Sequence, residues 1–147
     1  MDALQLLKQD HQTVKELFEQ AEGMEDGKEQ RQIFTQIKKE LETHARIEET
    51  VFYPAMQKHE GLKDMVLESI EEHKQVKTLL REMDDLANES EKFEPKLKVL
   101  MENVEHHAEE EEEGKMFPKV RELMDQAALE ELGQELEKAK GKKSKAA

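Results

Sequence analysis

Apolar residues recur every three or four positions along most of the chain, in four long segments separated by short polar breaks. This spacing places side chains on one face of an α-helix, because a helix advances about 100° per residue. The segments cover approximately residues 2–22, 29–58, 62–87 and 94–124. The breaks contain glycine, serine or proline, residues that end or cap helices. The pattern therefore predicts four long helices.

Long helices joined by short loops pack antiparallel to their neighbours in sequence. We therefore expect an all-α fold, an up-down-up-down antiparallel four-helix bundle over residues 1–125. A short accessory helix is expected over residues 126–138, where Leu129, Leu132 and Leu136 share one face. Residues 139–147 form a Lys-rich tail that is expected to be disordered.

The composition supports long helices and removes several classes of function. Charged residues make up 40% of the chain and aromatic residues only 4%, a mixture that suits helices better than sheets. A net charge of -13 argues against nucleic acid or an anionic membrane as a partner. The chain has no cysteine, which excludes disulfides, thiolate metal sites and cysteine catalysis. With no signal-peptide pattern and no apolar span, a cytoplasmic protein is expected.

Each apolar stripe is interrupted by a histidine, and two of the stripes also hold a glutamate one turn later. His11, for example, stands four residues after Leu7 and three before Val14. A buried carboxylate is costly without a partner, and no arginine shares these stripes. A metal ion would satisfy both residue types. The candidate ligands are His11, His44, Glu48, His73, His107 and Glu111.

The candidate ligands follow an internal repeat. His44 stands 33 residues after His11, and His107 stands 34 residues after His73. Each half of the chain thus has a helix with a lone histidine, followed by a helix with His-x-x-x-Glu. Two such halves can be related by an approximate two-fold axis, and residues near that axis converge.

Simpler interpretations exist for single residues. A lone core histidine is more often hydrogen-bonded than metal-bound, and His-x-x-x-Glu pairs are common on solvated helix faces. Only the conjunction across four helices favours a metal site. His106 is turned about 200° from Val104 and is expected in solvent, while His59 lies beside Gly61 in a predicted loop.

Four imidazoles and two carboxylates exceed the needs of a tetrahedral zinc site, and calcium or magnesium would use oxygen ligands alone. The set suits two iron ions, as an oxo- or hydroxo-bridged di-iron centre, with manganese as second choice. Counting bonds leaves about two coordination positions open for a small ligand. Ferritin-like bundles use four carboxylates with two histidines, so this nitrogen-rich set disfavours ferroxidase or oxygenase chemistry.

Four stretches, in this order, resemble the motifs of the hemerythrin-like (HHE cation-binding) family: "LLKQDHQTVKELF", "HARIEETVFYP", "EEHKQVKTLL" and "HHAEEEEEGKMFP". The resemblance covers roughly residues 3–124. It implies a non-haem di-iron centre that binds dioxygen or responds to oxygen, peroxide, nitric oxide or iron. Carried over by position, the implied ligands are the same six residues.

Two departures from the family pattern are visible. Oxygen-carrying hemerythrins have a further histidine at the position of Lys77, and its loss argues against reversible oxygen carriage. We expect Lys77 to extend toward solvent at the edge of the stripe. His107 is also one residue further from its proline, Pro118, than His44 is from Pro54.

The extra residue near Gly114 indicates a π-bulge or a local break, which could instead make His106 the ligand. The stripe geometry favours His107. Tyr53, the only tyrosine, is off the stripe and is expected at the rim of the bundle rather than beside iron.

The expected function is a di-iron protein that binds dioxygen, peroxide or nitric oxide, in sensing or in oxidative or nitrosative stress protection. One alternative is an iron-storage or iron-responsive interaction module. Another is an enzyme that decomposes peroxide or nitric oxide, so the sequence leaves turnover undecided. A signalling role would require a protein partner.

Overall fold

The computed structural model describes residues 1–87 and 90–141. All regular structure in these two ranges is helical. The longest elements are α1 (Ala3–Glu22), α2 (Gly27–Ile47), α4 (Lys63–Asp84), α5 (Phe93–Glu105) and α7 (Gln126–Gly141). The shorter ones are η1 (Glu48–Phe52), α3 (Tyr53–Gln57), η2 (Glu60–Leu62), η3 (His106–Met116) and α6 (Phe117–Leu123).

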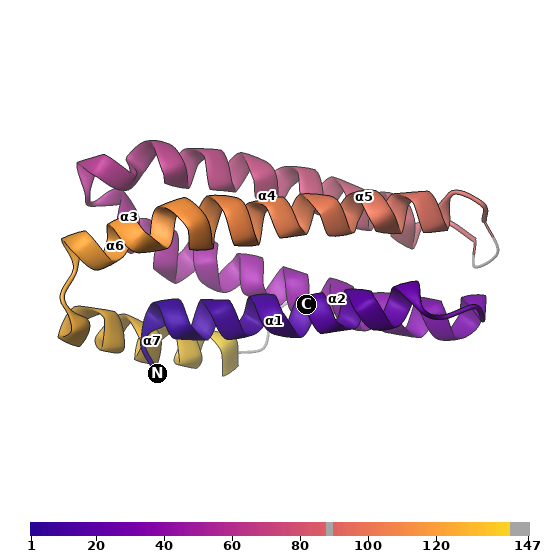
Figure 1. Cartoon of the computed structure of the whole chain (residues 1–147), viewed down its shortest axis with the longest axis horizontal. Helices are drawn as coiled ribbons and strands as arrows, with labels where there is room; N and C mark the ends of the chain where they lie inside the picture. Colours follow the sequence, from indigo (N-terminus) through magenta and orange to yellow (C-terminus); the bar gives the residue numbers. More distant parts are fainter. Residues whose placement is uncertain (88–89, 142–147) are drawn as a thin grey trace.

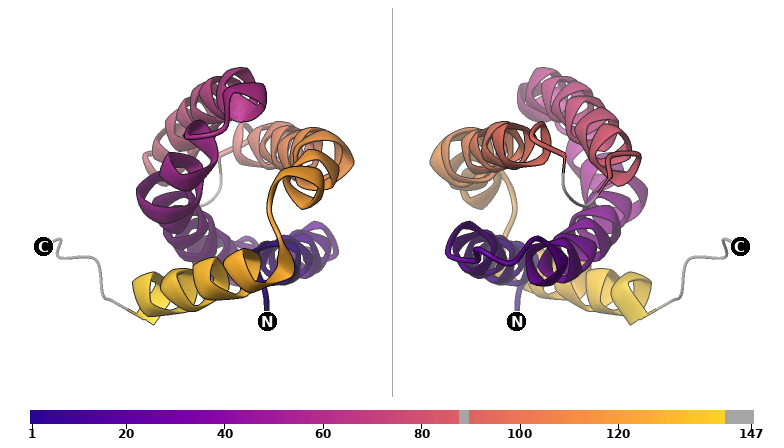
Figure 2. Two further views of the ribbon diagram at one scale, coloured as in Figure 1. Left: turned by 90° about the vertical axis from the view of Figure 1, so that its left-hand side faces the viewer. Right: turned by 90° about the vertical axis from the view of Figure 1, so that its right-hand side faces the viewer.

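Four rods run side by side along the long axis of the molecule (Figure 1). They are α1, the continuous α2–η1–α3, α4, and the continuous α5–η3–α6. Viewed along the rods, the four form a ring, and α7 lies across its outside against α1 (Figure 2). The predicted all-α bundle with an added C-terminal helix is confirmed.

The start of the first rod is fixed by a reciprocal cap. The Asp2 carboxylate accepts a hydrogen bond from the Gln5 backbone N–H, and the Gln5 side chain accepts one from the Asp2 N–H, both at 2.9 Å. Such a box satisfies two amide donors that the first helical turn leaves free. Gln126, the first residue of α7, donates to the same Asp2 carboxylate at 3.1 Å. The cap therefore joins the two ends of the fold.

The apolar core is divided into two clusters. One includes Phe52 and Phe117, and the other includes Phe18 and Phe34. On each rod a histidine stands between the clusters: on α1, Leu7 belongs to one cluster and Val14 to the other. The histidines thus form a polar layer that is closed off from water at both ends by apolar residues.

The accessory helix α7 packs closely against the bundle and contributes to its core. Leu129, Leu132 and Leu136 are buried in the cluster that contains Phe52. A Cβ atom on Gly133 would lie 2.4 Å from the Met1 carbonyl oxygen, so only glycine allows this close approach. The helix ends at Gly141, three residues after the predicted 138, and residues 142–147 of the predicted tail lie outside the described residues. The domain boundaries remain a prediction.

None of the helices in the described part of the chain is long and apolar enough to cross a membrane.

Candidate metal centre

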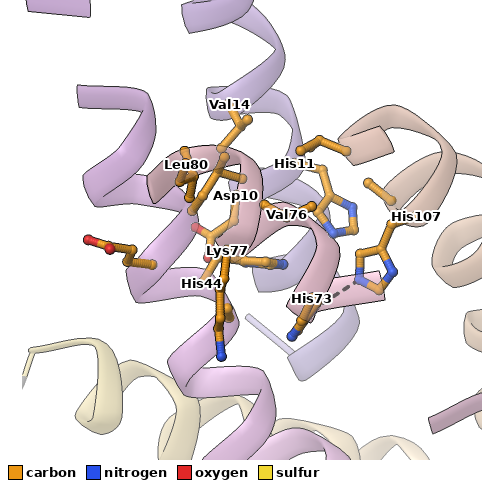
Figure 3. A pocket seen from close by; sticks show the side chains of 14 residues that line it. Asp10, His11, Val14, His44, His73, Val76, Lys77, Leu80 and His107 are labelled. Carbon is orange, nitrogen blue, oxygen red and sulfur yellow. Dashed lines mark hydrogen bonds and ion pairs between the residues drawn. The ribbon is translucent and has the colours of Figure 1, made fainter. Parts of the chain in front are cut away.

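The bundle centre gathers five of the six predicted residues. His11 comes from α1, His44 from α2, His73 from α4, and His107 from the start of η3, while Glu48 begins η1. His44, Glu48, His73 and His107 are buried, and the His11 side chain is only 9% exposed. The four imidazoles surround one pocket (Figure 3). A second glutamate joins them, but it is Glu112 and not the predicted Glu111.

The donor atoms form two groups that could each hold a metal ion. One group contains His11, His44, Glu48 and Glu112, and the other contains Glu48, His73 and His107. Within each group, one donor atom per residue lies within 4.8 Å of all the others. Glu48 belongs to both groups, so two neighbouring ions could share its carboxylate.

The second carboxylate also reaches both groups. Glu112 Oε1 lies 3.0 Å from His11 Nε2, and its Oε2 lies 3.3 Å from His107 Nε2. Glu48 Oε1 lies 3.0 Å from His73 Nε2 and 3.4 Å from His44 Nε2. Each carboxylate is therefore placed to bridge two ions, which is how two acidic groups can serve a pair of cations.

Two buried atoms in this cluster have no hydrogen bond among the described residues: Glu48 Oε2, and His44 Nε2, which lies 3.4 Å from Glu48 Oε1 but forms no hydrogen bond with it. An unpaired buried polar atom costs about 1–3 kcal/mol, and more when it is charged. Nearby, His73 Nε2 and His107 Nε2 approach within 3.2 Å. Two imidazole nitrogens at that separation can both bind one metal ion through bonds of about 2.1 Å. A bound metal ion would therefore satisfy these donor atoms better than their contacts with one another do.

The outer nitrogen of each imidazole faces a carboxylate. A carboxylate only accepts hydrogen bonds, so each Nδ1 carries a proton and donates it, and in the neutral ring that binds a metal this leaves the Nε2 lone pair directed inward. The four pairs are His11 with Glu113 at 2.5 Å, His44 with Asp10 at 2.9 Å, His73 with Glu49 at 2.6 Å, and His107 with Glu72 at 2.6 Å.

These carboxylates follow the two-fold repeat of the chain. Asp10 precedes His11 but supports His44, the histidine of the next helix. In the other half, Glu72 and His107 form the matching pair. Glu49 and Glu113 directly follow Glu48 and Glu112, and each supports the lone histidine of the opposite half. None of these four carboxylates was predicted from the sequence, although each stands next to a ligand position in the chain, which is the signal that could have found them.

Neighbouring charges in the cluster shift the pKa values of its histidines and of Glu48 in the direction opposite to the effect of burial. Burial alone would lower the pKa of His44, but Glu48 and the hydrogen bond to Asp10 outweigh it and raise that pKa to about 10. Burial likewise opposes protonation of His107, yet Glu112 raises its pKa well above the ordinary value. For Glu48, burial favours the neutral acid, but His44 brings the carboxyl pKa well below its usual range. A bound metal ion would take the place of the protons on His44 and His107.

Tyr53 is part of this centre, so its predicted position at the rim is wrong. Its side chain is buried, and its hydroxyl donates to Glu112 Oε2 at 2.5 Å. The Tyr53 hydroxyl oxygen also lies 3.3 Å from His107 Nε2 and 3.4 Å from His73 Nε2. The cause is the π-helical segment η1, in which the Tyr53 N–H donates to the Glu48 carbonyl five residues earlier. The wider turn rotates Tyr53 inward, which regular helical spacing does not anticipate.

The prediction of Glu111 is corrected for the same reason. Glu112 is fully buried, whereas Glu111 lies toward Lys115 Nζ at 3.2 Å and the exposed His106. The π-helix η3 spans this region, and the Phe117 N–H donates to the Glu112 carbonyl. A residue five positions after His107 therefore faces the centre. Counting back from proline would have found it, because Glu48 and Glu112 each stand six residues before Pro54 and Pro118 respectively.

The remaining histidines and Lys77 lie as the spacing indicated. The His106 side chain is 51% exposed and its Nδ1 lies 2.7 Å from Glu110, so it is not the inward histidine. His59 lies in the bend between α3 and η2. Lys77 is half exposed, and its Nζ donates to both oxygens of Glu49 at 3.1 Å. Because Glu49 supports His73, Lys77 also contributes to the centre.

A small cavity adjoins the four imidazoles. Its volume is about 40 Å³, and its walls are mainly apolar, with Val14, Leu41, Val76, Leu80 and Val104 among them. A single water needs roughly 10–15 Å³ of such space, so the cavity has room for a molecule of two or three heavy atoms. The space beside the centre therefore suits a small ligand.

Comparisons with known proteins agree with this arrangement. The family described as hemerythrin HHE cation binding domain matches residues 2–120. A crystal structure of a hemerythrin HHE cation-binding domain-containing protein from Mycobacterium kansasii is similar, with a TM-score of 0.82 and 28% identity over 96% of this chain and 88% of that one.

A second relative, from Nostoc sp., carries the name DNA nickase. It is 28% identical over 142 residues, which is 97% of this chain but 40% of that protein. This chain thus spans less than half the length of that relative. The match over residues 2–120 covers most of the sequence and includes every residue of the centre. The chain therefore belongs to the hemerythrin HHE cation-binding domain family.

Proposed function

We propose that this protein holds a non-haem di-iron centre and binds dioxygen, peroxide or nitric oxide there, in sensing or in protection against oxidative and nitrosative stress. One observation supports the metal most directly: His44 Nε2 and Glu48 Oε2 are buried in the described structure without a hydrogen-bond partner. Family membership makes a cation the expected occupant.

In this proposal the two groups of donor atoms serve one ion each. His11 and His44 would bind one ion, and His73 and His107 the other, with the Tyr53 oxygen beside the second pair. The carboxylates of Glu48 and Glu112 would be shared. This set differs from the sequence prediction by the exchange of Glu111 for Glu112 and by the addition of Tyr53.

Iron is the cation that this donor set suits best. The donors are imidazole nitrogens and carboxylate or phenol oxygens, without sulfur, and they are too many for one tetrahedral zinc ion. Manganese accepts similar ligands and is the second choice. When bound, the iron pair would supply redox chemistry that none of these side chains provides. The four supporting carboxylates would hold the imidazoles in the orientation that binding requires.

The ligand class follows from the cavity. Apolar walls beside the imidazoles favour a small molecule with little or no charge over a solvated anion. Dioxygen and nitric oxide meet that description, and neutral hydrogen peroxide is of similar size. The regulatory or protective role would depend on which of them binds most tightly.

Turnover of peroxide or nitric oxide is a second candidate, and Tyr53 favours it. Its buried hydroxyl donates to Glu112 beside two candidate ligands. As long as the phenol keeps its proton and does not itself bind iron, it could deliver that proton to a molecule bound there. Cleavage of DNA, which the name of the Nostoc relative mentions, is disfavoured for this chain, because a net charge of -13 repels the phosphate backbone.

The test is metal analysis of aerobically purified protein, combined with optical spectra before and after each gas or peroxide is added. We expect about two irons per chain and a stoichiometric spectral change with at least one ligand. Glu48→Gln should lose most of the iron, whereas His106→Ala, which changes an exposed histidine, should retain it. A folded wild-type protein that takes up no iron would contradict the proposal, and continued consumption of the ligand would identify an enzyme.

A further inference from the structure

Two of the four carboxylates behind the imidazoles are themselves held by a lysine. Glu49, behind His73, accepts from Lys77 of the neighbouring rod α4. Asp10, behind His44, accepts from Lys140, which comes from α7 outside the bundle. The first arrangement lies wholly within the four rods. The second connects the candidate metal centre to the accessory helix.

Asp10 is buried and divides its two oxygens between these partners. Its Oδ2 lies 2.9 Å from His44 Nδ1, and its Oδ1 accepts from Lys140 Nζ. With both oxygens engaged, the carboxylate has one orientation, and the His44 ring is fixed with it. Removal of Lys140 would leave a buried anion with one donor fewer, which is costly.

The last turn of α7 also contacts the bundle beside Lys140, where Ala139 packs against the cluster that contains Phe52. Arg46 of α2 donates to the Ala139 carbonyl at 3.3 Å, next to Lys140. Leu129, Leu132 and Leu136 anchor the preceding turns of α7 in the same cluster. Among the described residues, the Lys140–Asp10 ion pair joins the end of α7 to the carboxylate behind the candidate ligand His44.

We infer that α7 is a working part of the metal centre: Lys140 positions Asp10, Asp10 positions His44, and docking of the end of α7 and metal binding at the His11–His44 group stabilise each other. The inference rests on the proposed function, since it requires that the group binds metal. If metal binding tightens the contact with α7, then a docked α7 must raise metal affinity by the same factor.

The test uses ferrous iron alone, added without oxygen to the full chain and competed with a chelator. Lys140→Met should weaken binding of one of the two ions by about tenfold, and Asp10→Asn by about 10- to 100-fold, the range found when a residue that orients a ligand is lost. Lys138→Met is the matched control, because Lys138 is an exposed lysine two residues earlier in the same helix. Lys140→Arg should restore most of the affinity.

A second measurement separates this positioning role from a loss of general stability. Hydrogen exchange in residues 126–141 of the wild type should slow when ferrous iron is added, and Lys140→Met should remove most of that slowing. Lys77→Met, the equivalent change behind His73, should weaken the other ion while iron still slows exchange in α7.

Each outcome has a distinct meaning. Wild-type protein that binds no ferrous iron would overturn the proposed function itself. Wild-type and Lys140→Met proteins that bind two ions equally, with the same iron-dependent exchange in α7, would overturn only the coupling. If Lys140→Met fails to fold, the exchange of wild-type α7 with and without iron still decides, because an α7 indifferent to iron contradicts the inference.

Discussion

Glu112 Oε2 lies 3.3 Å from His107 Nε2, although five residues rather than four separate the two along the chain. In a regular α-helix a residue five positions on is turned about 140° away. The π-helical segment η3 brings the two side chains onto one face. The π-helical segment η1 likewise turns Tyr53 inward. Both halves of the centre therefore depend on π-helical turns.

Replacing each carboxylate in turn by the neutral amide should distinguish the role of Glu112 from that of Glu111. Glu112→Gln should reduce iron affinity by more than about 100-fold, beyond the effect of losing a residue that only orients a ligand. Glu111→Gln should leave it unchanged, because Glu111 contacts Lys115 and His106 outside the cluster. Iron content after dialysis measures both. Equal loss in the two variants would contradict the placement of Glu112.

Tyr53→Phe should leave the fold intact but change the affinity for iron and the ferric absorption spectrum. The ring remains to fill the core, but the hydroxyl that lies 3.4 Å from His73 Nε2 is removed. We expect about tenfold weaker binding of the ion at His73 and His107, and loss of any visible absorption due to tyrosine bound to ferric iron. Gln30→Ala, which changes a buried polar residue that donates to Ala21 and Glu94 instead, should keep that absorption. An unchanged ferric spectrum in Tyr53→Phe would place the phenol outside the coordination sphere.

Iron binding should release protons at neutral pH. The pKa of His44 is raised to about 10 in the metal-free protein, so this imidazole is protonated at pH 7 and must lose its proton to bind a cation. Metal affinity should therefore increase with pH up to about pH 10. Titration calorimetry in buffers of different ionisation enthalpy measures the protons released. A binding heat that does not depend on the buffer would contradict this prediction.

The metal-free protein should show the opposite dependence of stability on pH. A raised histidine pKa contributes stability that is fully present below about pH 6.5, the ordinary histidine value, and is lost as the pH rises toward 10. We therefore expect the melting temperature of metal-free protein to fall between pH 6.5 and 10. Thermal melts in a chelator measure it, with His44→Gln as the variant in which the fall should be smaller.

Gly133→Val should loosen α7 at its contact with the start of the chain. A Cβ atom there would lie 2.4 Å from the Met1 carbonyl oxygen and 3.0 Å from the Ala3 nitrogen, and backbone atoms cannot move aside cheaply. We expect a loss of about 2 kcal/mol in the free energy of unfolding, which lowers the melting temperature by roughly 4–8 °C in a chain of this size. Gly141→Val, where no atom lies within 4 Å, is the control. Equal melting temperatures would contradict the close approach.

Local periodicity was sufficient for the fold and for most of the candidate centre. The interrupted stripes located the helices and placed His11, His44, Glu48, His73 and His107 on inward faces, because the spacing of a regular helix fixes which side chains share a face. The same spacing separated His107 from the exposed His106. These inferences required only the geometry of single helices and the cost of burying charge.

Tertiary structure decided the rest. The spacing failed at Glu112 and Tyr53, because π-turns depart from the period on which it relies. The carboxylates behind the imidazoles and the reach of Lys140 to Asp10 join different helices, and periodicity along one helix contains no information about its neighbours. Helical periodicity defines which faces turn inward. Which side chains meet there depends on the relative rotation and register of the rods, and these exist only in the assembled bundle.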